Sequence, residues 1–392
     1  MPSAKGRSTP SWHTWRVSKP STGDRVAKAS SSSTELLKLR GRIDAIDRQL
    51  RTLLNNRAAC AEEVARLKTR LDADAPAYYR PDREAEILAR LRAENEGPLP
   101  DAHIERLFRE IISCCLSLEQ PLTIACLGPS GTYTEAAAIK QFGHFAKMRT
   151  LSTVADVFRE VESGAAHYGV VAVENSTDGM VKHTLDCFTT SSLSICAEVE
   201  LPIHHALLIR RGGDPEEIVE ICSHEQSLAQ CRHWLDVRYP TQSRRPVSSN
   251  AEAARIAADT DGVAAIAGEA AADRDGLDTA YANNQHQPRH KTRILVVGKK
   301  QEEPSGRDRT SIIVSTRNEP GALYKVLAPF KRHDISLSRI ESRPSQTSAW
   351  DYVFFIDFEG HRNDDSVTGV LAELNKVATG VKNLGSYPRA LD

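Results

Sequence analysis

The feature that most constrains this chain is an apolar pattern at helical spacing that runs from Leu36 to Leu67. Apolar residues recur there three or four positions apart, which predicts one helix from Thr34, as N-cap, to about Thr69. Such a helix would be roughly 52 Å long at 1.5 Å per residue. A small helical module cannot cover so long an apolar stripe, so we expect the helix to pack against a second copy of the chain.

One column of this stripe contains an arginine. Steps of seven residues pass through Leu36, Ile43, Leu50, Arg57 and Val64. A guanidinium that faces a core is costly unless an anion pairs with it. Lys68 lies only about 20° from Arg57 around the helix, whereas Arg40 lies about 100° away and would have to come from a partner helix to reach the same point.

Two shorter helices are predicted next, one from Pro81 to about Asn95 and one from Asp101 to Glu119. Cys115 and Glu119 share an apolar face of the third helix, which places a carboxyl group in the core pattern. The charged residues allow two interpretations. One is a buried arginine–glutamate pair that fixes helix register, and the other is a pocket for a small dianion, since guanidinium binds carboxylate in a bidentate manner.

The segments LKLRGRIDAIDRQLRTLLNNRAACAEEVARLK, YRPDREAEIL and RLFREIISCCLSLEQ together resemble the all-helical chorismate mutase domain. The resemblance implies an intertwined homodimer that rearranges chorismate to prephenate, with Arg57, Lys68 and Glu119 as catalytic residues. It implies substrate contacts by Arg40 (from the other chain), Arg57, Lys68, Arg83, Glu84, Cys115 and Glu119. Cys115 and Glu119 replace a familiar serine and glutamine, and Glu119 must carry a proton to donate a hydrogen bond to the substrate.

The spacing of the apolar residues changes at Leu122. Short apolar runs suited to buried strands (LTIACLG, HYGVVAVE, LSICAEVELPI, HALLIR, VAAIA and TRILVVG) alternate with the helical segments TYTEAAAIKQF, SLAQCRHWL and NAEAARIAA. This alternation predicts an α/β domain over residues 122–300. It is preceded by a helical domain over residues 34–121.

Four polar motifs follow these strands or begin these helices: GPSGTYTEAA (128–137), VENSTDG (173–179), SHEQSLAQC (223–231) and KTRILVVG (291–298). Ligands of open α/β sheets bind beyond strand ends, and helix N-termini bind carboxylates. Each motif alone is also compatible with an ordinary turn.

In this order the four motifs resemble prephenate dehydratase, a two-lobed α/β fold like that of periplasmic binding proteins. The resemblance implies loss of water and CO2 from prephenate, with Thr292 as proton donor and Arg293 on a carboxylate. The remaining implied site residues are Thr132, Glu174, Asn175, Ser176, Ser223, His224 and Gln226. His290 and Ile294 depart from the family pattern around Thr292, and we expect an active but slower enzyme.

A charged linker (301–309) precedes residues 310–390, whose strand–helix–strand–strand–helix–strand order predicts a ferredoxin-like α+β domain. GALY (321–324) and ESRP (341–344) resemble the phenylalanine-binding motifs of ACT regulatory domains. The resemblance implies an allosteric L-phenylalanine site formed by Gly321, Ala322, Leu323, Glu341, Ser342, Arg343 and Pro344.

Composition excludes several other classes. The formal net charge of −1 gives no general attraction to nucleic acid or membrane, and no apolar run approaches the roughly 18 residues of a membrane span. The eight cysteines form no CxxC pair, which favours a reducing, cytoplasmic location. Residues 1–33 are basic and serine-rich, and we expect either a disordered tail or a start codon placed too far upstream.

Together these resemblances imply a bifunctional chorismate mutase/prephenate dehydratase that is inhibited by L-phenylalanine, and they imply no metal or organic cofactor. Its partners would be chorismate, prephenate, phenylalanine and further copies of the chain. Two alternatives stay open. One is a phenylalanine sensor with a weakened dehydratase cleft, and the other is a dehydratase that prefers arogenate, against which the mutase module speaks.

Overall fold

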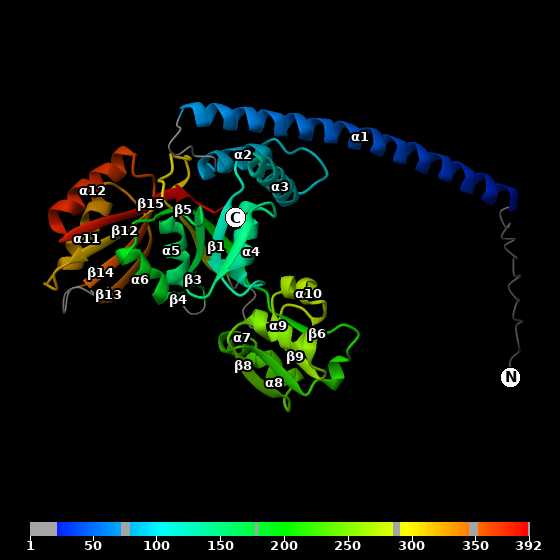
Figure 1. Cartoon of the computed structure of the whole chain (residues 1–392). Coiled ribbons are helices and arrows are strands. Elements are labelled where there is room, and N and C mark those ends of the chain that lie inside the picture. Colours follow the sequence, from blue (N-terminus) through cyan, green and yellow to red (C-terminus); the bar gives the residue numbers. More distant parts are fainter. Residues whose placement is uncertain (1–21, 72–78, 177–178, 285–290, 345–351, 391–392) are drawn as a thin grey trace, which may run out of the picture. The chain divides into compact units, whose positions relative to one another are not determined.

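The computed structural model describes residues 22–71, 79–176, 179–284, 291–344 and 352–390 of the chain. Contacts divide the chain into two compact units, Met1–Cys60 and Ala61–Asp392. Figure 1 shows the elements along the chain. The predicted tail lies outside the described residues up to position 21, and the first helix begins at Thr22, within that segment.

The N-terminal module contains α1 (Thr22–Leu71), α2 (Pro81–Ala93) and α3 (Asp101–Glu119). The bounds of α3 are those that the sequence predicts, because Pro100 and Pro121 flank it. The apolar side chains of α1 are exposed, with Leu50 at 51% and Leu53 at 64%. This helix therefore presents an exposed apolar stripe.

The first α/β lobe has a mixed sheet in the order β2-β1-β3-β11-β5, with β4 paired to β3. Its strands are β1 (Thr123–Leu127), β2 (Lys147–Leu151), β3 (Tyr168–Asn175), β4 (Gly179–Met180), β5 (Ser194–Pro202) and β11 (Lys291–Gly298). Its helices are α4 (Tyr133–Phe142), α5 (Val154–Ser163) and α6 (Lys182–Thr190). Strand β11 is antiparallel to both neighbours, so its first residues lie beside the last residues of β3.

The second lobe has a sheet in the order β10-β6-β9-β7-β8. Its strands are β6 (Ala206–Arg210), β7 (Glu220–His224), β8 (Ser243–Val247), β9 (Val263–Ala267) and β10 (Leu277–Tyr281). Its helices are η1 (Pro215–Glu217), α7 (Glu225–Gln230), α8 (Arg232–Arg238), α9 (Asn250–Asp259) and α10 (Glu269–Asp275). The chain passes between the lobes after β5 and again after β10. The segment SLAQCRHWL is helical as predicted, and Cys231 divides it between α7 and α8.

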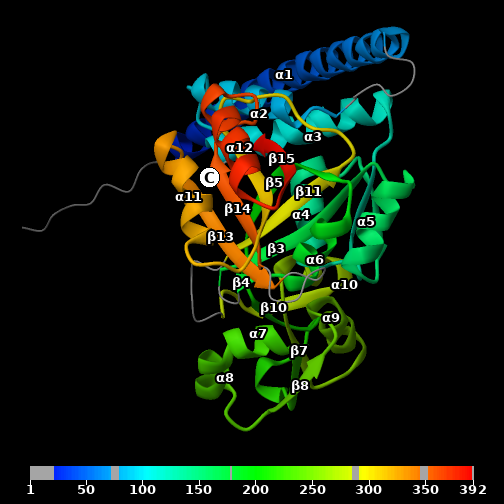
Figure 2. The ribbon, with the colours of Figure 1, turned by 90° about the vertical axis from the view of Figure 1, so that its left-hand side faces the viewer.

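The C-terminal domain consists of β12 (Asp308–Thr316), α11 (Ala322–Arg332), β13 (Leu337–Pro344), β14 (Tyr352–Glu359), α12 (Asp365–Val377) and β15 (Gly380–Pro388). Its antiparallel sheet has the order β13-β14-β12-β15, which confirms the predicted ferredoxin-like fold. Phe330 of α11 packs on Phe358 of β14, with ring centroids 5.1 Å apart. Figure 2 shows both helices beside this sheet.

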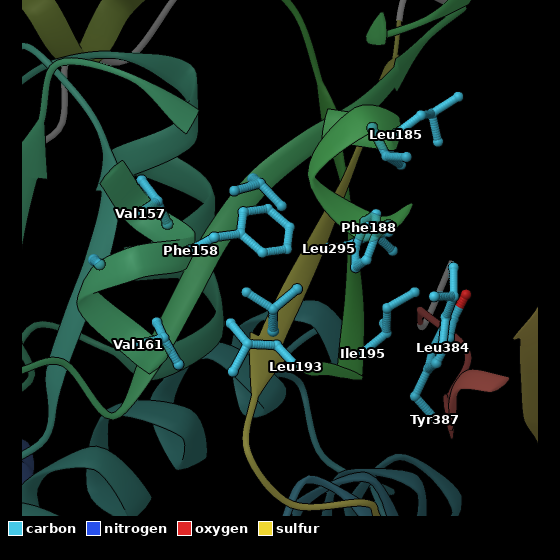
Figure 3. Packing of buried hydrophobic residues seen from close by; sticks show 14 of the residues in the cluster. Val157, Phe158, Val161, Leu185, Phe188, Leu193, Ile195, Leu295, Leu384 and Tyr387 are labelled. Carbon is cyan, nitrogen blue, oxygen red and sulfur yellow. The ribbon is translucent and has the colours of Figure 1, made fainter. Parts of the chain in front are cut away.

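One hydrophobic core continues from the first lobe into the C-terminal domain. Figure 3 shows Leu384 and Tyr387 of β15 beside Ile195 of β5. Gly385 permits this approach, because a Cβ atom on it would stand 2.3 Å from the carbonyl oxygen of Ile195, and its φ is +138°. Strands of the two domains are therefore packed as parts of one interior.

Among the described residues, no helix has the length and apolar character needed to cross a membrane. All eight cysteines are free thiols.

Candidate active sites

A cleft of about 240 Å³ is lined by residues of both α/β lobes. Its walls include five of the predicted dehydratase residues, namely Thr132, Asn175, His224, Gln226 and Thr292. They come from α4, β3, β7, α7 and β11. The structure thus brings together residues that lie as far as 160 positions apart in the sequence (292 minus 132).

Thr292 and Asn175 are part of the cleft's first-lobe wall. They are opposite each other in the β3–β11 ladder, and Asn175 Nδ2 donates to Thr292 Oγ1 at 3.5 Å. Ser176 is not a lining residue; its amide donates to the Lys291 carbonyl at 2.9 Å and its hydroxyl accepts from the Lys291 amide at 3.1 Å. Ser176 therefore fixes the start of the strand that carries Thr292.

Thr132 is the N-cap of α4. Its hydroxyl donates to the Leu127 carbonyl at 2.9 Å and accepts from the Glu135 amide at 3.4 Å. Gly131 precedes it with φ +88°, a conformation that glycine adopts without strain. The first turn of α4 thus begins at the cleft, where helix amides favour an anion.

Asn250 organises the second-lobe wall, and sequence reasoning missed it. Its Oδ1 accepts from Ser227 Oγ at 3.0 Å and from the His224 amide at 3.2 Å, and it lies 2.9 Å from Ser223 Oγ. Ser223 is fully buried and does not line the cleft, so it acts through Asn250. The only sequence signal was an asparagine at a predicted helix start.

A second missed group joins Tyr133, His205 and Gln230 where the lobes meet. Tyr133 Oη is 3.1 Å from His205 Nδ1, and His205 Nε2 is 2.7 Å from Gln230 Oε1. Burial raises the pKa of Tyr133, so its hydroxyl stays a hydrogen-bond donor. His205 stood inside an apolar run in the sequence, which gave no reason to select it.

Arg293 and Glu174, two further residues of the predicted dehydratase site, do not line this cleft. The Arg293 guanidinium is 7% exposed and binds Glu198, Asp357 and Tyr387. Side chains alternate between the two faces of a strand, so the residue that follows Thr292 points away from the cleft. In this placement the guanidinium is engaged by protein groups, and its predicted contact with a substrate carboxylate stays a prediction.

On the mutase side, Lys68 Nζ lies 3.9 Å from Glu119 Oε2, and Cys115 is buried one turn earlier on α3. Arg83 pairs with Glu86 on the surface of α2.

Glu84 is buried, with its Oε1 3.2 Å from Arg109 Nε, and burial raises the pKa of this carboxyl to about 7 although Arg109 opposes the shift. Arg40 and Arg57 lie on the part of α1 that belongs to the first compact unit.

In the C-terminal domain, Gly321 is the N-cap of α11 with φ +80°, and a Cβ atom on it would meet open space. Ala322 and Leu323 begin the helix.

The other predicted residues, Glu341, Ser342, Arg343 and Pro344, end β13, which is an edge strand. Arg343 Nη1 binds Asp186 at 2.8 Å and the Lys182 carbonyl at 2.8 Å.

The sequence matches three families: chorismate mutase type II over residues 39–120, prephenate dehydratase over 124–302 and the ACT domain over 310–376. It is 48% identical to a bifunctional chorismate mutase/prephenate dehydratase of Pseudomonas aeruginosa, over 91% of this chain and 98% of that one. A Neisseria gonorrhoeae protein of the same description is 47% identical over 91% of this chain and 98% of its own length. The crystal structure of an Arthrobacter aurescens prephenate dehydratase in complex with L-Phe matches with a TM-score of 0.64 and 35% identity, over 69% of this chain and 90% of that one.

Proposed function

The chain belongs to the family of bifunctional chorismate mutase/prephenate dehydratases, and from this premise we propose that it converts chorismate to prephenate and prephenate to phenylpyruvate. The main support for the conversion of prephenate to phenylpyruvate is the hydrogen bond between Thr292 and Asn175. Both residues line the interlobe cleft beside the N-terminus of α4.

The dehydration requires a proton donor, because hydroxide is a poor leaving group. Asn175 donates to Thr292 Oγ1, so the hydroxyl hydrogen of Thr292 is free to point to the ring hydroxyl of prephenate. The ring carboxylate leaves as CO2, its electron pair completes the aromatic ring, and the C–O bond breaks to release water. Thr132 and the first amides of α4 are placed to hold a carboxylate.

The mutase step needs no nucleophile, because chorismate rearranges within one molecule once it is held in a compact conformer. We assign this step to Lys68 and Glu119, whose Nζ and Oε2 atoms lie 3.9 Å apart. Lys68 would stabilise negative charge that develops on the ether oxygen, and a protonated Glu119 would donate to it. Arg57, with Arg40 from another chain, would hold the two carboxylates.

We further propose a homodimer, because α1 exposes an apolar stripe that a second copy of α1 can cover. The ACT domain would bind L-phenylalanine, as the Arthrobacter aurescens relative does, and lower dehydratase activity. The free cysteines are compatible with the reducing cytoplasm in which we place the enzyme.

The sensor alternative depended on the altered residues around Thr292. Ile294 is fully buried and packs in the core of the first lobe, so β11 stays ordered without the aromatic side chain of the family. His290 lies outside the described residues. The intact arrangement of Thr292 and Asn175 favours an enzyme over a sensor.

Crossed substitutions test the proposal. Thr292→Val removes the hydroxyl at constant shape, and we expect prephenate to accumulate from chorismate while dehydration slows by about 100-fold or more. Lys68→Ala should convert supplied prephenate normally but form none from chorismate. Assays of both products in both variants check this, and phenylpyruvate formation at the normal rate by Thr292→Val would exclude the proposed role of Thr292.

A further inference from the structure

The β3–β11 ladder presents two pairs of residues to opposite sides. Thr292 is opposite Asn175 in the ladder, and Arg293 is opposite Glu174. Because strand side chains alternate, the first pair faces the cleft and the second pair faces the other way. Each cleft residue is therefore covalently next to a residue that points to the ACT domain.

On the side of the ladder that faces away from the cleft, each of the three guanidinium nitrogens of Arg293 donates a hydrogen bond. Its Nε donates to Glu198 at 2.9 Å, its Nη1 to Asp357 at 2.5 Å and its Nη2 to Tyr387 at 2.8 Å. Asp357 and Tyr387 belong to β14 and β15 of the ACT sheet, and Arg309 of β12 also binds Glu198. Three of the four strands of the ACT sheet therefore contribute a residue that binds either Arg293 or Glu198.

The acceptors of Arg293 are joined to each other. Ser311 Oγ donates to Asp357 Oδ1 at 2.6 Å, so the Tyr387 hydroxyl, 2.7 Å from Ser311 Oγ, donates in turn to Ser311. The result is a closed ring of hydrogen bonds through Arg293, Tyr387, Ser311 and Asp357. Such a buried ring tolerates little change in the position of any one member.

Glu174 forms a second link. Its carboxylate pairs with Arg339 of β13, the strand that ends in the ESRP motif. Arg343, within that motif, pairs with Asp186 of α6. The strand predicted to bind phenylalanine is therefore tied by two arginines to the domain that contains the cleft.

We infer that Arg293 and Glu174 are positioning residues, which tie Thr292 and Asn175 to the ACT sheet so that effector binding there sets the alignment of the proton donor. This inference rests on the proposed dehydratase function. The shared core around Tyr387 and Ile195 gives the link its stiffness, since a close-packed interior transmits small displacements (Figure 3).

Tyr387→Phe tests the link, since it removes one hydroxyl from the ring and keeps the aromatic side chain. In the full-length chain we expect kcat for prephenate to fall about fivefold or more with KM little changed. Phenylalanine should still bind, measured by calorimetry, but its inhibition should weaken by a similar factor. The control is Tyr352→Phe, a tyrosine on β14 that is 42% exposed, which should behave as the wild type.

The internal standard for folding is the mutase activity of the same chain. If Tyr387→Phe loses that activity as well, Arg339→Gln breaks the second link without touching the buried ring, and the same loss of phenylalanine inhibition is expected. Inhibition of wild-type strength in folded Tyr387→Phe and Arg339→Gln would overturn the inference.

Arg293→Lys separates positioning from substrate binding. A lysine cannot reach three acceptors at once, so we expect a lower kcat and weaker inhibition at nearly unchanged KM. A large rise in KM with full phenylalanine inhibition would instead make Arg293 a substrate ligand and overturn the inference. A wild-type chain that never forms phenylpyruvate would refute the proposed function itself, which is a different result.

Discussion

At the scale of single residues, burial decides which ionisable groups respond to pH. Glu84, a predicted mutase residue, is 6% exposed on α2, and burial raises the pKa of its carboxyl to about 7 against the opposing charge of Arg109. In the unfolded chain the ordinary value of 4.5 applies. The folded chain therefore binds a proton more tightly, and its stability falls as pH rises from 4.5 through 7.

Glu84→Gln should remove this part of the pH dependence. Between pH 5 and pH 8 the wild type should lose on the order of 2 kcal/mol more stability than the variant. Urea unfolding at the two pH values measures the difference. Glu86→Gln, a substitution at an exposed residue of the same helix, is the matched control. Parallel curves for Glu84→Gln and the wild type would show that Glu84 does not titrate in this range.

At the scale of elements, α1 has an apolar stripe that needs a partner. Its leucines and isoleucines are exposed along the described length, and the proposed mutase site needs an arginine from another chain. If two copies of the chain pair along α1, the apolar stripe is buried and each mutase site receives an arginine from the other copy. The stripe that the sequence shows as a helical pattern is thus also the proposed subunit interface.

Leu50→Asp should convert the chain to monomers, because it places a charge in the middle of that stripe. Mutase activity should fall by about 100-fold or more, since the second subunit no longer supplies its arginine. Sedimentation equilibrium and a chorismate assay measure both effects. Thr52→Asp, on the opposite side of the same helix, should leave both unchanged, and a monomeric Leu50→Asp chain with normal mutase activity would contradict the shared site.

Sequence patterns predicted the bounds of a helix or strand well where neighbouring residues in the sequence determine those bounds. The bounds of α3 and β9 agree with the prediction, since prolines flank the helix and the apolar run VAAIA is the strand. The break between α7 and α8 was missed, because the apolar spacing continues across Cys231. The ion pairs of Arg293 could not be predicted, because the motif that contains it does not show which face of β11 its side chain takes.

At the scale of the whole molecule, the cleft residues Thr132, Asn175 and Thr292 could be selected from sequence motifs, whereas Asn250 and His205 could not. The last two act through partners far away in the sequence, such as Ser223 and Tyr133, which only the fold brings near. The same is true of the ACT residues that hold Arg293. We therefore expect regulation to depend on contacts between domains, which sequence motifs do not show.

We propose that one chain performs two successive reactions and that phenylalanine restrains the second. The most direct test incubates the full-length protein with chorismate and follows prephenate and phenylpyruvate separately, with and without L-phenylalanine. We expect prephenate to appear first and phenylpyruvate to replace it, and we expect phenylalanine to make prephenate accumulate. Prephenate that accumulates without phenylpyruvate when no phenylalanine is present would contradict the dehydratase function.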